Sequence, residues 1–292
     1  MFASLVDSGL VKENVDLSDL TTYKVGGPAR LFADVRNPDD LQAVMELIRE
    51  RQPTVLLLGR GSNLVISDRG FDGLVIRLGG RYATASVIGA GRIEAGGGMS
   101  LPTLARYSVK QDRAGLEFLV GIPGSVGGAV RMNAGCHGSE IADVIDSAEV
   151  VDLRSGSTAR RTAPALELAY RSSNLHDHEA VASAVFLSTP GSRLEGEERM
   201  REVTRWRREH QPGGTRNAGS VFKNPPGDAA GRIIDELGLK GLRVGRVAVS
   251  RRHANFFEAD RGASAQEVYE LVHSVQEKVL AATGILLEQE IR

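Results

Sequence analysis

Residues 115–135 read GLEFLVGIPGSVGGAVRMNAG, and this glycine-rich stretch is the strongest pointer to the fold. Its glycines keep side chains off one path along the backbone, while Pro123 stiffens the turn. Backbone amides can then lie flat against a pyrophosphate group or a planar ring, although a purely structural role is the alternative. We therefore take this stretch as the first candidate ligand-binding segment.

A second glycine-containing loop lies upstream, where residues 56–63 read LLLGRGSN. An apolar strand runs directly into small residues, and successive backbone N–H groups of such a loop can form a nest for an anion. Ser62 and Asn63 add side-chain donors, whereas an ordinary turn between a strand and a helix is the competing interpretation. Of the 34 glycines in the chain, 18 fall between Gly59 and Gly138, without the Gly-X-Y period of collagen.

Composition and charge exclude several classes of protein. The 292 residues suffice for two domains, and the formal net charge of −1 argues against a general nucleic-acid binder. The single Cys136 excludes an internal disulfide framework and a cysteine-only metal cage. The first residues lack the pattern of a signal peptide and no apolar run is long enough to span a bilayer. We therefore expect a cytoplasmic protein with no membrane or obligate protein partner.

Several familiar catalytic motifs are missing from the sequence. It contains no P-loop, no G-x-G-x-x-G after a strand, no G-x-S-x-G elbow and no H-E-x-x-H helix. His176 and His178 have a spacing that metal ligands can use, but their polar surroundings favour a surface loop. We expect no metal ion.

The order of apolar segments predicts an α+β fold with a change of composition near residue 190. A strand–helix–strand unit opens the chain, short β segments broken by glycine follow, and the last third is rich in charged helical sequence. The strands are expected at 31–35, 54–58, 74–78, 85–88, 92–95, 148–153 and 180–187. The helices are expected at 41–48, 101–111, 193–210 and 268–283, the last with Gly284 as its C-cap.

Seven segments, taken in order, resemble the UDP-N-acetylenolpyruvoylglucosamine reductase family, flavoenzymes of bacterial peptidoglycan-precursor synthesis. The segments are 21–29 (TTYKVGGPA), 59–63, 115–135, 170–173 (YRSS), 219–225 (GSVFKNP), 249–256 and 287–291 (LEQEI). They span nearly the whole chain, which makes the resemblance specific although no single segment would be.

The resemblance implies an FAD-binding region of two α+β subdomains, of the vanillyl-alcohol-oxidase type, followed by a smaller α+β substrate-binding lobe. We expect the FAD region at 1–190, with subdomains of about 1–80 and 81–190, and the lobe at 191–284. Residues 285–292 are expected to return as a strand to the second subdomain. The implied reaction uses NADPH to reduce FAD, and hydride then passes to the enolpyruvyl methylene carbon, giving UDP-N-acetylmuramate.

By the same resemblance, the two glycine-containing stretches hold the cofactor. The residues implied in FAD binding are Gly59, Arg60, Gly61, Ser62, Asn63, Gly121, Ile122, Pro123, Gly124, Ser125, Gly127, Gly128, Asn133, Ala134 and Gly135. Arg60 stands where the family commonly has glycine, so its side chain either points away from the cofactor or adds a contact.

The implied chemistry needs a cation beside the substrate carboxylate and a proton donor for the adjacent carbon. The resemblance assigns these roles to Arg171 and Ser220. It assigns a catalytic carboxylate to Glu290, with Glu288 as the alternative. The expected substrate-binding residues are Tyr170, Lys223 and Asn224.

Two further features bear on the substrate. Residues 240–252 hold five basic residues and no acid, which fits either a site for the UDP phosphates or a solvated basic face. The short connection between Arg171 and Ser220 lacks the tyrosine-bearing insertion of one family branch, so the chain resembles the shorter branch. An FAD-dependent oxidase or dehydrogenase with another substrate, and a non-catalytic sugar-nucleotide binding protein, are the alternative functions.

Overall fold

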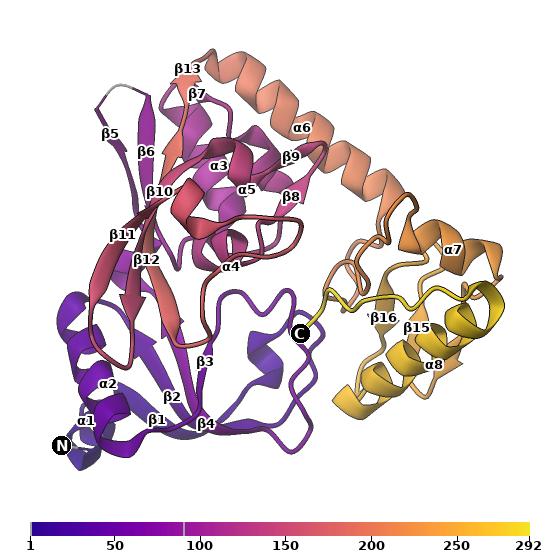
Figure 1. The fold of residues 1–292 in the computed structure, drawn as a ribbon, viewed down its shortest axis with the longest axis horizontal. Helices are drawn as coiled ribbons and strands as arrows, with labels where there is room; N and C mark the ends of the chain where they lie inside the picture. The colour runs from indigo at the N-terminus through magenta and orange to yellow at the C-terminus, as the bar shows by residue number, and fades with distance from the viewer. Residues whose placement is uncertain (1, 90) are drawn as a thin grey trace. The chain divides into compact units, whose positions relative to one another are not determined.

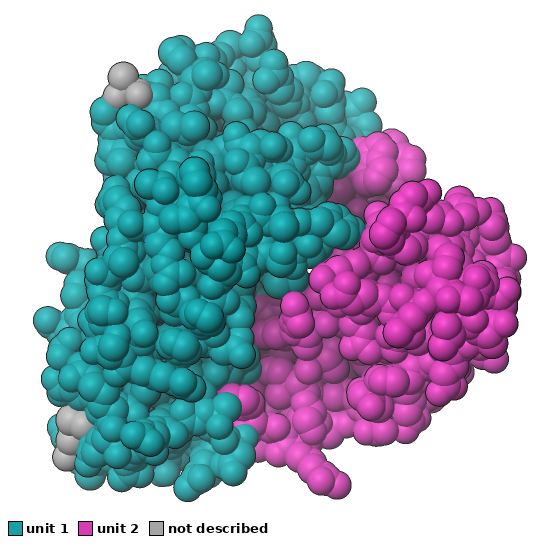
Figure 2. Space-filling model, in the orientation of Figure 1, with its two compact units in different colours: residues 1–15, 29–60, 72–205 teal, residues 16–28, 61–71, 206–292 magenta. Residues whose placement is uncertain are grey.

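A computed structural model describes residues 2–89 and 91–292. The chain forms two compact units (Figure 2). Unit 1 comprises residues 1–15, 29–60 and 72–205, and unit 2 comprises residues 16–28, 61–71 and 206–292. Both units therefore contain segments that are far apart in the sequence.

The first sheet of unit 1 has the strand order β1-β2-β4-β3. Its strands are β1 (Val11–Asp16), β2 (Pro28–Val35), β3 (Val55–Leu57) and β4 (Phe71–Leu78), and helix α1 (Phe2–Asp7) precedes them. Helix α2 (Pro38–Arg51) connects β2 to β3, and the Asn37 side chain caps it by accepting the Asp40 amide. The predicted strand–helix–strand unit is confirmed, and β3 runs parallel to β4.

The second sheet of unit 1 is antiparallel, in the order β11-β10-β12-β6-β5. Its strands are β5 (Ala85–Ile88), β6 (Arg92–Gly96), β10 (Ile145–Asp152), β11 (Thr158–Thr162) and β12 (Glu179–Leu187). Helices α3 (Leu101–Lys110), α4 (Val126–Arg131) and α5 (Ile141–Val144) lie beside this sheet (Figure 1). Apolar side chains of these helices and of β6, β10 and β12 form one buried core.

A second core connects the two sheets of unit 1. It contains apolar residues of α2, β2 and β4 together with Val151 and Leu153 from the end of β10, and Ala180 and Ala182 of β12. Two short ribbons complete the unit: β7 (Arg113–Ala114) pairs with β13 (Thr189–Pro190), and β8 (Gly135–Cys136) pairs with β9 (Ser139–Glu140). Helix α6 (Arg193–His210) follows β13, as its charged sequence predicts.

Unit 2 is built on a small antiparallel sheet, β14 (Arg243–Val244), β15 (Val247–Val249) and β16 (Phe257–Ala259). Helices α7 (Ala230–Glu236) and α8 (Ala265–Thr283) share its core. Ser264 and Glu267 form a capping box at the start of α8, and Gly284 ends the helix in the left-handed conformation. The predicted apolar stripe and C-cap of this helix are confirmed.

The C-terminal segment belongs to unit 2. Gln289 pairs with Phe222, the Glu290 amide donates to the Val221 carbonyl, and Leu287 and Ile291 are buried in the core of unit 2. Residues 285–292 thus join unit 2, whereas the sequence predicts that they return to the second subdomain. The compact units also divide at residues 205 and 206, within α6, and so do not coincide with the predicted boundary at 190.

None of the helices in the described part of the chain combines the length and the apolar content that a membrane crossing requires.

Candidate active site

The loop that follows β3 has backbone amides that no described residue accepts. Across residues 2–89 and 91–292, no protein acceptor is hydrogen-bonded to the backbone N–H of any residue from 59 to 63. The loop is instead fixed through its carbonyl groups, because the amide and the hydroxyl of Thr22 both donate to the Gly61 carbonyl at 3.0 and 3.3 Å. Such a row of free N–H groups is an anion-binding arrangement.

Glycine is required at position 61 for two reasons. Its φ of +62° lies in the left-handed region, and a Cβ atom there would collide with the Leu20 carbonyl oxygen. Segment 20–22 therefore backs the loop from within unit 2. The sequence contained a signal for this support, because residues 21–29 belong to the motifs that carry the family resemblance, but it did not indicate what they do.

The end of the loop is tied to the C-terminus of the chain. The Asn63 side chain donates to the Glu290 carbonyl at 3.0 Å, and the Arg292 amide donates to the Asn63 carbonyl at 3.0 Å. Two predicted site residues, Asn63 and Glu290, are thus brought together in unit 2 through the backbone of Glu290.

The second glycine-rich stretch uses its amides differently. The backbone N–H groups of residues 126–129 and 132–134 donate to acceptors inside unit 1, among them the carbonyls of Gly97 and Met99. Ser125 caps helix α4, and its hydroxyl accepts the Gly128 amide at 3.3 Å. The expectation that amides of this stretch face a ligand is not met at these positions, because they are already bonded within the protein.

The two stretches meet at Gly59 and Ser125, both in unit 1. A Cβ atom at position 59 would collide with the Ser125 hydroxyl, so glycine lets the loop approach the start of α4. The structure therefore brings Gly59, which follows β3, next to the N-cap of α4. Arg60, beside Gly59, is exposed to solvent.

The Arg171 side chain contacts the C-terminal end of the second glycine-rich stretch. It occupies a tight turn closed by pairing of Ala169 with Ser172, and its φ is +55°. Its guanidinium donates to the carbonyls of Asn133 and Gly135, each at 3.4 Å, and its Cζ lies 5.1 Å from the centre of the Tyr170 ring. An uncommon backbone conformation of this kind persists only where its surroundings hold it.

Asn133 holds that turn in place. Its side chain is fully buried, donates to the Ala169 carbonyl at 3.1 Å and accepts the Ala142 amide at 2.9 Å. The resemblance implies that Asn133 takes part in FAD binding, and the structure adds that its side chain supports the turn that carries Arg171. Sequence reasoning missed this role because the partners are backbone groups 9 and 36 residues away.

The predicted proton donor lies in unit 2. Ser220 pairs with Phe256, next to β16, and follows Gly219, whose φ is +77°. Asn224 lies four residues further on, and its side-chain oxygen accepts the Ala230 amide at the start of α7 at 3.1 Å. The Asn224 side chain therefore fixes the segment that follows Ser220.

Lys223 and Glu288 form an ion pair of 2.6 Å between Nζ and Oε1. The Lys223 side chain is 13% exposed and that of Glu288 is 70% exposed. The carboxylate of Glu288 is thus paired with a cation in this structure. Arg171 belongs to unit 1, whereas Ser220, Lys223, Asn224 and Glu290 belong to unit 2.

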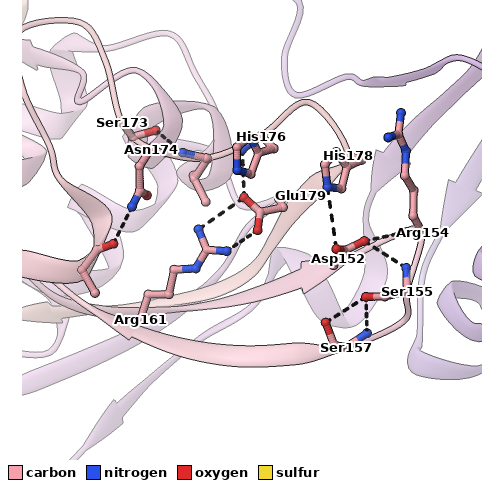
Figure 3. A network of polar contacts seen from close by, with 12 residues as sticks. Asp152, Arg154, Ser155, Ser157, Arg161, Ser173, Asn174, His176, His178 and Glu179 are labelled. Carbon is pink, nitrogen blue, oxygen red and sulfur yellow. Dashed lines mark hydrogen bonds and ion pairs between the residues drawn. The ribbon is translucent and has the colours of Figure 1, made fainter.

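The His176–His178 segment forms a polar network (Figure 3). Glu179 is buried, accepts the His176 amide and pairs with Arg161, while His178 lies 3.7 Å from Asp152. Burial raises the pKa of Glu179, but the His176 amide and the Arg161 guanidinium outweigh it, so the pKa lies below its ordinary value. No cluster able to hold a metal ion occurs in the part of the chain that the structure describes.

The fit to a dinucleotide cofactor follows from the loop after β3. Five successive amides have no acceptor among residues 2–89 and 91–292, and the small residues Gly59, Gly61 and Ser62 leave them accessible, which suits the pyrophosphate of FAD. The backbone groups and small residues of this loop thus agree with an FAD site.

Comparisons with known proteins agree with this reading. Residues 29–161 match the family model of an FAD binding domain, and residues 211–292 match that of the UDP-N-acetylenolpyruvoylglucosamine reductase C-terminal domain. The chain is 40% identical over 287 residues to UDP-N-acetylenolpyruvoylglucosamine reductase 2 of Symbiobacterium thermophilum, covering 98% of this chain and 92% of that protein. It is 41% identical to the reductase of Heliobacterium modesticaldum, covering 94% and 88%.

Among solved structures, it is similar to UDP-N-acetylenolpyruvylglucosamine reductase from Thermus caldophilus. The TM-score is 0.84 at 38% identity, with 96% of this chain and 97% of the other covered. The chain belongs to the UDP-N-acetylenolpyruvoylglucosamine reductase family.

Proposed function

We propose that this protein uses FAD and NADPH to reduce UDP-N-acetylenolpyruvoylglucosamine to UDP-N-acetylmuramate. Family membership over nearly the full length supports the reaction. The row of unbonded amides from 59 to 63 is the observation that carries the cofactor. Both substrates are small metabolites of the cytoplasm, which supports a cytoplasmic location.

The residues proposed to hold FAD are those of the loop after β3, where Gly59 lies beside Ser125, the N-cap of α4. When bound, FAD supplies the hydride, taken from NADPH, that adds to the enolpyruvyl methylene carbon. The amides of residues 59–63 would bind the pyrophosphate, and Ser125 would keep Gly59 in place by contact.

Arg171 is proposed to bind the substrate carboxylate. Hydride addition leaves negative charge on the neighbouring carbon, and this charge spreads into the carboxylate as an enolate. A guanidinium can hold a carboxylate with two parallel hydrogen bonds and so stabilise that charge. The hydrogen bonds of Arg171 to the Asn133 and Gly135 carbonyls hold its guanidinium in place. The hydrogen bond from the buried Asn133 side chain to the Ala169 carbonyl holds the turn that carries Arg171.

Ser220 is proposed to donate the proton that completes the reaction at the carbon next to the carboxylate. A serine hydroxyl is a weak acid, so neighbouring groups must favour the transfer. Glu290 remains the proposed catalytic carboxylate, as the resemblance of residues 287–291 to the family implies, while Glu288 pairs with Lys223. Tyr170, Lys223 and Asn224 are proposed to contact the substrate.

A two-stage flavin experiment tests this function. NADPH is expected to bleach the flavin absorbance of the purified protein, and colour should return in anaerobic solution only after the enolpyruvyl substrate is added. Reoxidation by a different acceptor, and none by this substrate, would favour another oxidoreductase of the same fold. A protein that binds no flavin would favour the non-catalytic alternative.

Ser220→Ala assigns the proton donor. NADPH should still bleach the flavin at the wild-type rate, while reoxidation by substrate should slow by about 100-fold or more, the usual scale of general acid catalysis. Equal losses in both stages would mean that Ser220 is structural.

A further inference from the structure

The last residues of the chain lie between two segments for which functions are proposed above. Within unit 2, residues 287–292 are hydrogen-bonded to residues 63–65, where the loop after β3 ends, and to residues 221–223, which follow Ser220. Most of these hydrogen bonds join backbone groups, as in a small irregular sheet. The C-terminal segment therefore connects the end of the proposed cofactor loop to the segment of the proposed proton donor.

The backbone of Glu290 is held on both sides of its α-carbon. Its amide donates to the Val221 carbonyl at 2.8 Å, and its carbonyl accepts the side-chain amide of Asn63 at 3.0 Å. The next residue, Ile291, is buried in the core of unit 2. Because the N, Cα and C atoms of a residue set the direction of its Cα–Cβ bond, these contacts limit the positions that the Glu290 carboxylate can reach.

Asn63 binds the C-terminal segment through two of its own groups. Its side-chain Nδ2 donates to the Glu290 carbonyl, and its backbone carbonyl accepts the Arg292 amide at 3.0 Å. The two hydrogen bonds hold the chain on either side of Ile291. The backbone N–H of Asn63 belongs to the row of amides proposed to bind the pyrophosphate. This residue thus offers its N–H to the proposed cofactor site and its side chain to the backbone of Glu290.

We propose that Asn63 is a positioning residue for the reaction, and that it acts by holding the backbone of Glu290. The inference rests on the proposed function, in which Glu290 is the catalytic carboxylate, and adds the side chain that keeps this carboxylate in place. The resemblance implies only that Asn63 takes part in FAD binding. Because a catalytic group displaced by about 1 Å can lose much of its effect, removal of the Asn63 side chain should slow the step that uses Glu290.

The two half-reactions of the flavin-loaded enzyme test this role. Asn63→Ala should keep the wild-type rate of flavin reduction by NADPH and an FAD dissociation constant within about threefold of the wild type, whereas reoxidation by the enolpyruvyl substrate should slow by about 10-fold. Gln276→Ala is the matched control, because it removes a side-chain amide that donates to the Leu287 carbonyl at 2.8 Å, three residues before Glu290. Equal slowing in the control would contradict a specific role of Asn63.

A double-mutant cycle with Glu290→Gln separates action through Glu290 from an independent effect. Asn63→Ala added to Glu290→Gln should slow reoxidation by less than about a further twofold, because the carboxylate that Asn63 positions is already gone. Losses that multiply fully in the double variant would overturn the proposal. Wild-type reoxidation in Asn63→Ala would overturn it as well, and so would a loss of FAD affinity or of the flavin-reduction rate in that variant.

Amide hydrogen exchange of the flavin-loaded protein gives a readout that needs no turnover. Asn63→Ala, and Asn63→Leu with a side chain of similar size but no donor, should each speed exchange at residues 290–292 by about 10-fold. Unchanged exchange there in both variants would refute the proposal. If the wild-type flavin is not reoxidised by the enolpyruvyl substrate, the proposed function fails instead, and the exchange result alone decides whether Asn63 holds Glu290.

Discussion

The loop at 59–63 and the stretch at 121–135 are both rich in glycine, yet their backbones do different things. In the first, the amides have no acceptor among the described residues, and the protein holds the loop by its carbonyl groups. In the second, most amides donate hydrogen bonds within helix α4 or to the carbonyls of Gly97 and Met99. Its glycines allow close packing against neighbouring backbone. Gly127, for example, would place a Cβ atom 3.2 Å from the Gly97 carbonyl.

The difference separates two uses of glycine that look alike in a sequence. One exposes the backbone to a ligand, and the other lets two parts of the protein approach each other. We infer that the first stretch binds the charged part of the cofactor, while the second shapes the wall beside it and supports Arg171 through Asn133. The following predictions test this division, beginning with the largest expected effect.

Gly61→Ala should have the largest effect, a loss of FAD affinity. Alanine at a φ of +62° is strained, and its Cβ would collide with the Leu20 carbonyl, so the loop must move. We expect the dissociation constant of FAD to rise by roughly 100-fold, or about 3 kcal/mol, in a fluorescence titration of flavin-free protein.

Gly128→Ala is the matched substitution in the second stretch. Its Cβ would lie 3.3 Å from the Ser125 hydroxyl, which must then shift by a few tenths of an ångström, and we expect FAD affinity to change by no more than about threefold. Equal losses of FAD affinity in Gly61→Ala and Gly128→Ala would contradict the proposed difference between the two stretches. The melting temperature of each flavin-free variant separates a local effect from unfolding.

Asn133→Ala should destabilise unit 1 by about 2 kcal/mol, since it removes two hydrogen bonds of a fully buried side chain. Because the turn at 169–172 loses its support, flavin reoxidation by substrate should slow more than flavin reduction by NADPH. Asn174→Ala is the control, as it removes one hydrogen bond, to Ala165, from the same loop. A selective loss of FAD affinity in Asn133→Ala would show that this side chain touches the cofactor after all.

The turn at 176–179, to which Arg131 at the end of α4 is hydrogen-bonded, should give unit 1 an acid-sensitive component. The pKa of Glu179 is lower in the folded protein than in the unfolded chain, so its contribution is complete above pH 4–5 and is lost as pH falls through the folded value. Glu179→Gln should therefore destabilise the protein by about 1.5 kcal/mol at pH 7 and by less at pH 3. Urea unfolding at the two pH values measures this, and an equal effect at both would exclude the linkage.

Gly59→Ala and Ser125→Ala should be coupled, because the added Cβ collides with the hydroxyl that the second change removes. Ser125→Ala alone should lower the free energy of unfolding by about 1 kcal/mol, because it removes the N-cap of α4. We expect Gly59→Ala to add almost nothing to the unfolding free energy lost in Ser125→Ala, although it destabilises the wild type. Strictly additive losses would mean that the two stretches do not meet at this point.

Much of the fold follows from local sequence. The periodicity of α2 and α8, the Gly284 cap, and the strands at 85–88 and 180–187 depend on residues close together in the chain, and the structure confirms them. The place of the C-terminal segment did not follow, because its pairing with Val221 and Phe222 depends on backbone groups about 70 residues away.

The candidate site shows the same limit. Motif resemblance indicated Arg171, Ser220 and the two glycine-containing stretches, but residue types alone could not distinguish free amides from bonded ones. Residue types alone also could not predict the ion pair between Glu288 and Lys223. Nor could they show that Arg216 and Arg261 line the same cavity in unit 2 as Arg251. These features arise from tertiary contacts, which leave no periodic signal in the sequence.

Amide hydrogen exchange tests the central claim most directly. Peptides of flavin-free protein are compared with those of the same protein after FAD is restored. We predict strong new protection in the peptide that contains residues 59–63 and little change in residues 126–134, whose amides are already bonded. Strong protection of 126–134 with none at 59–63 would contradict the account.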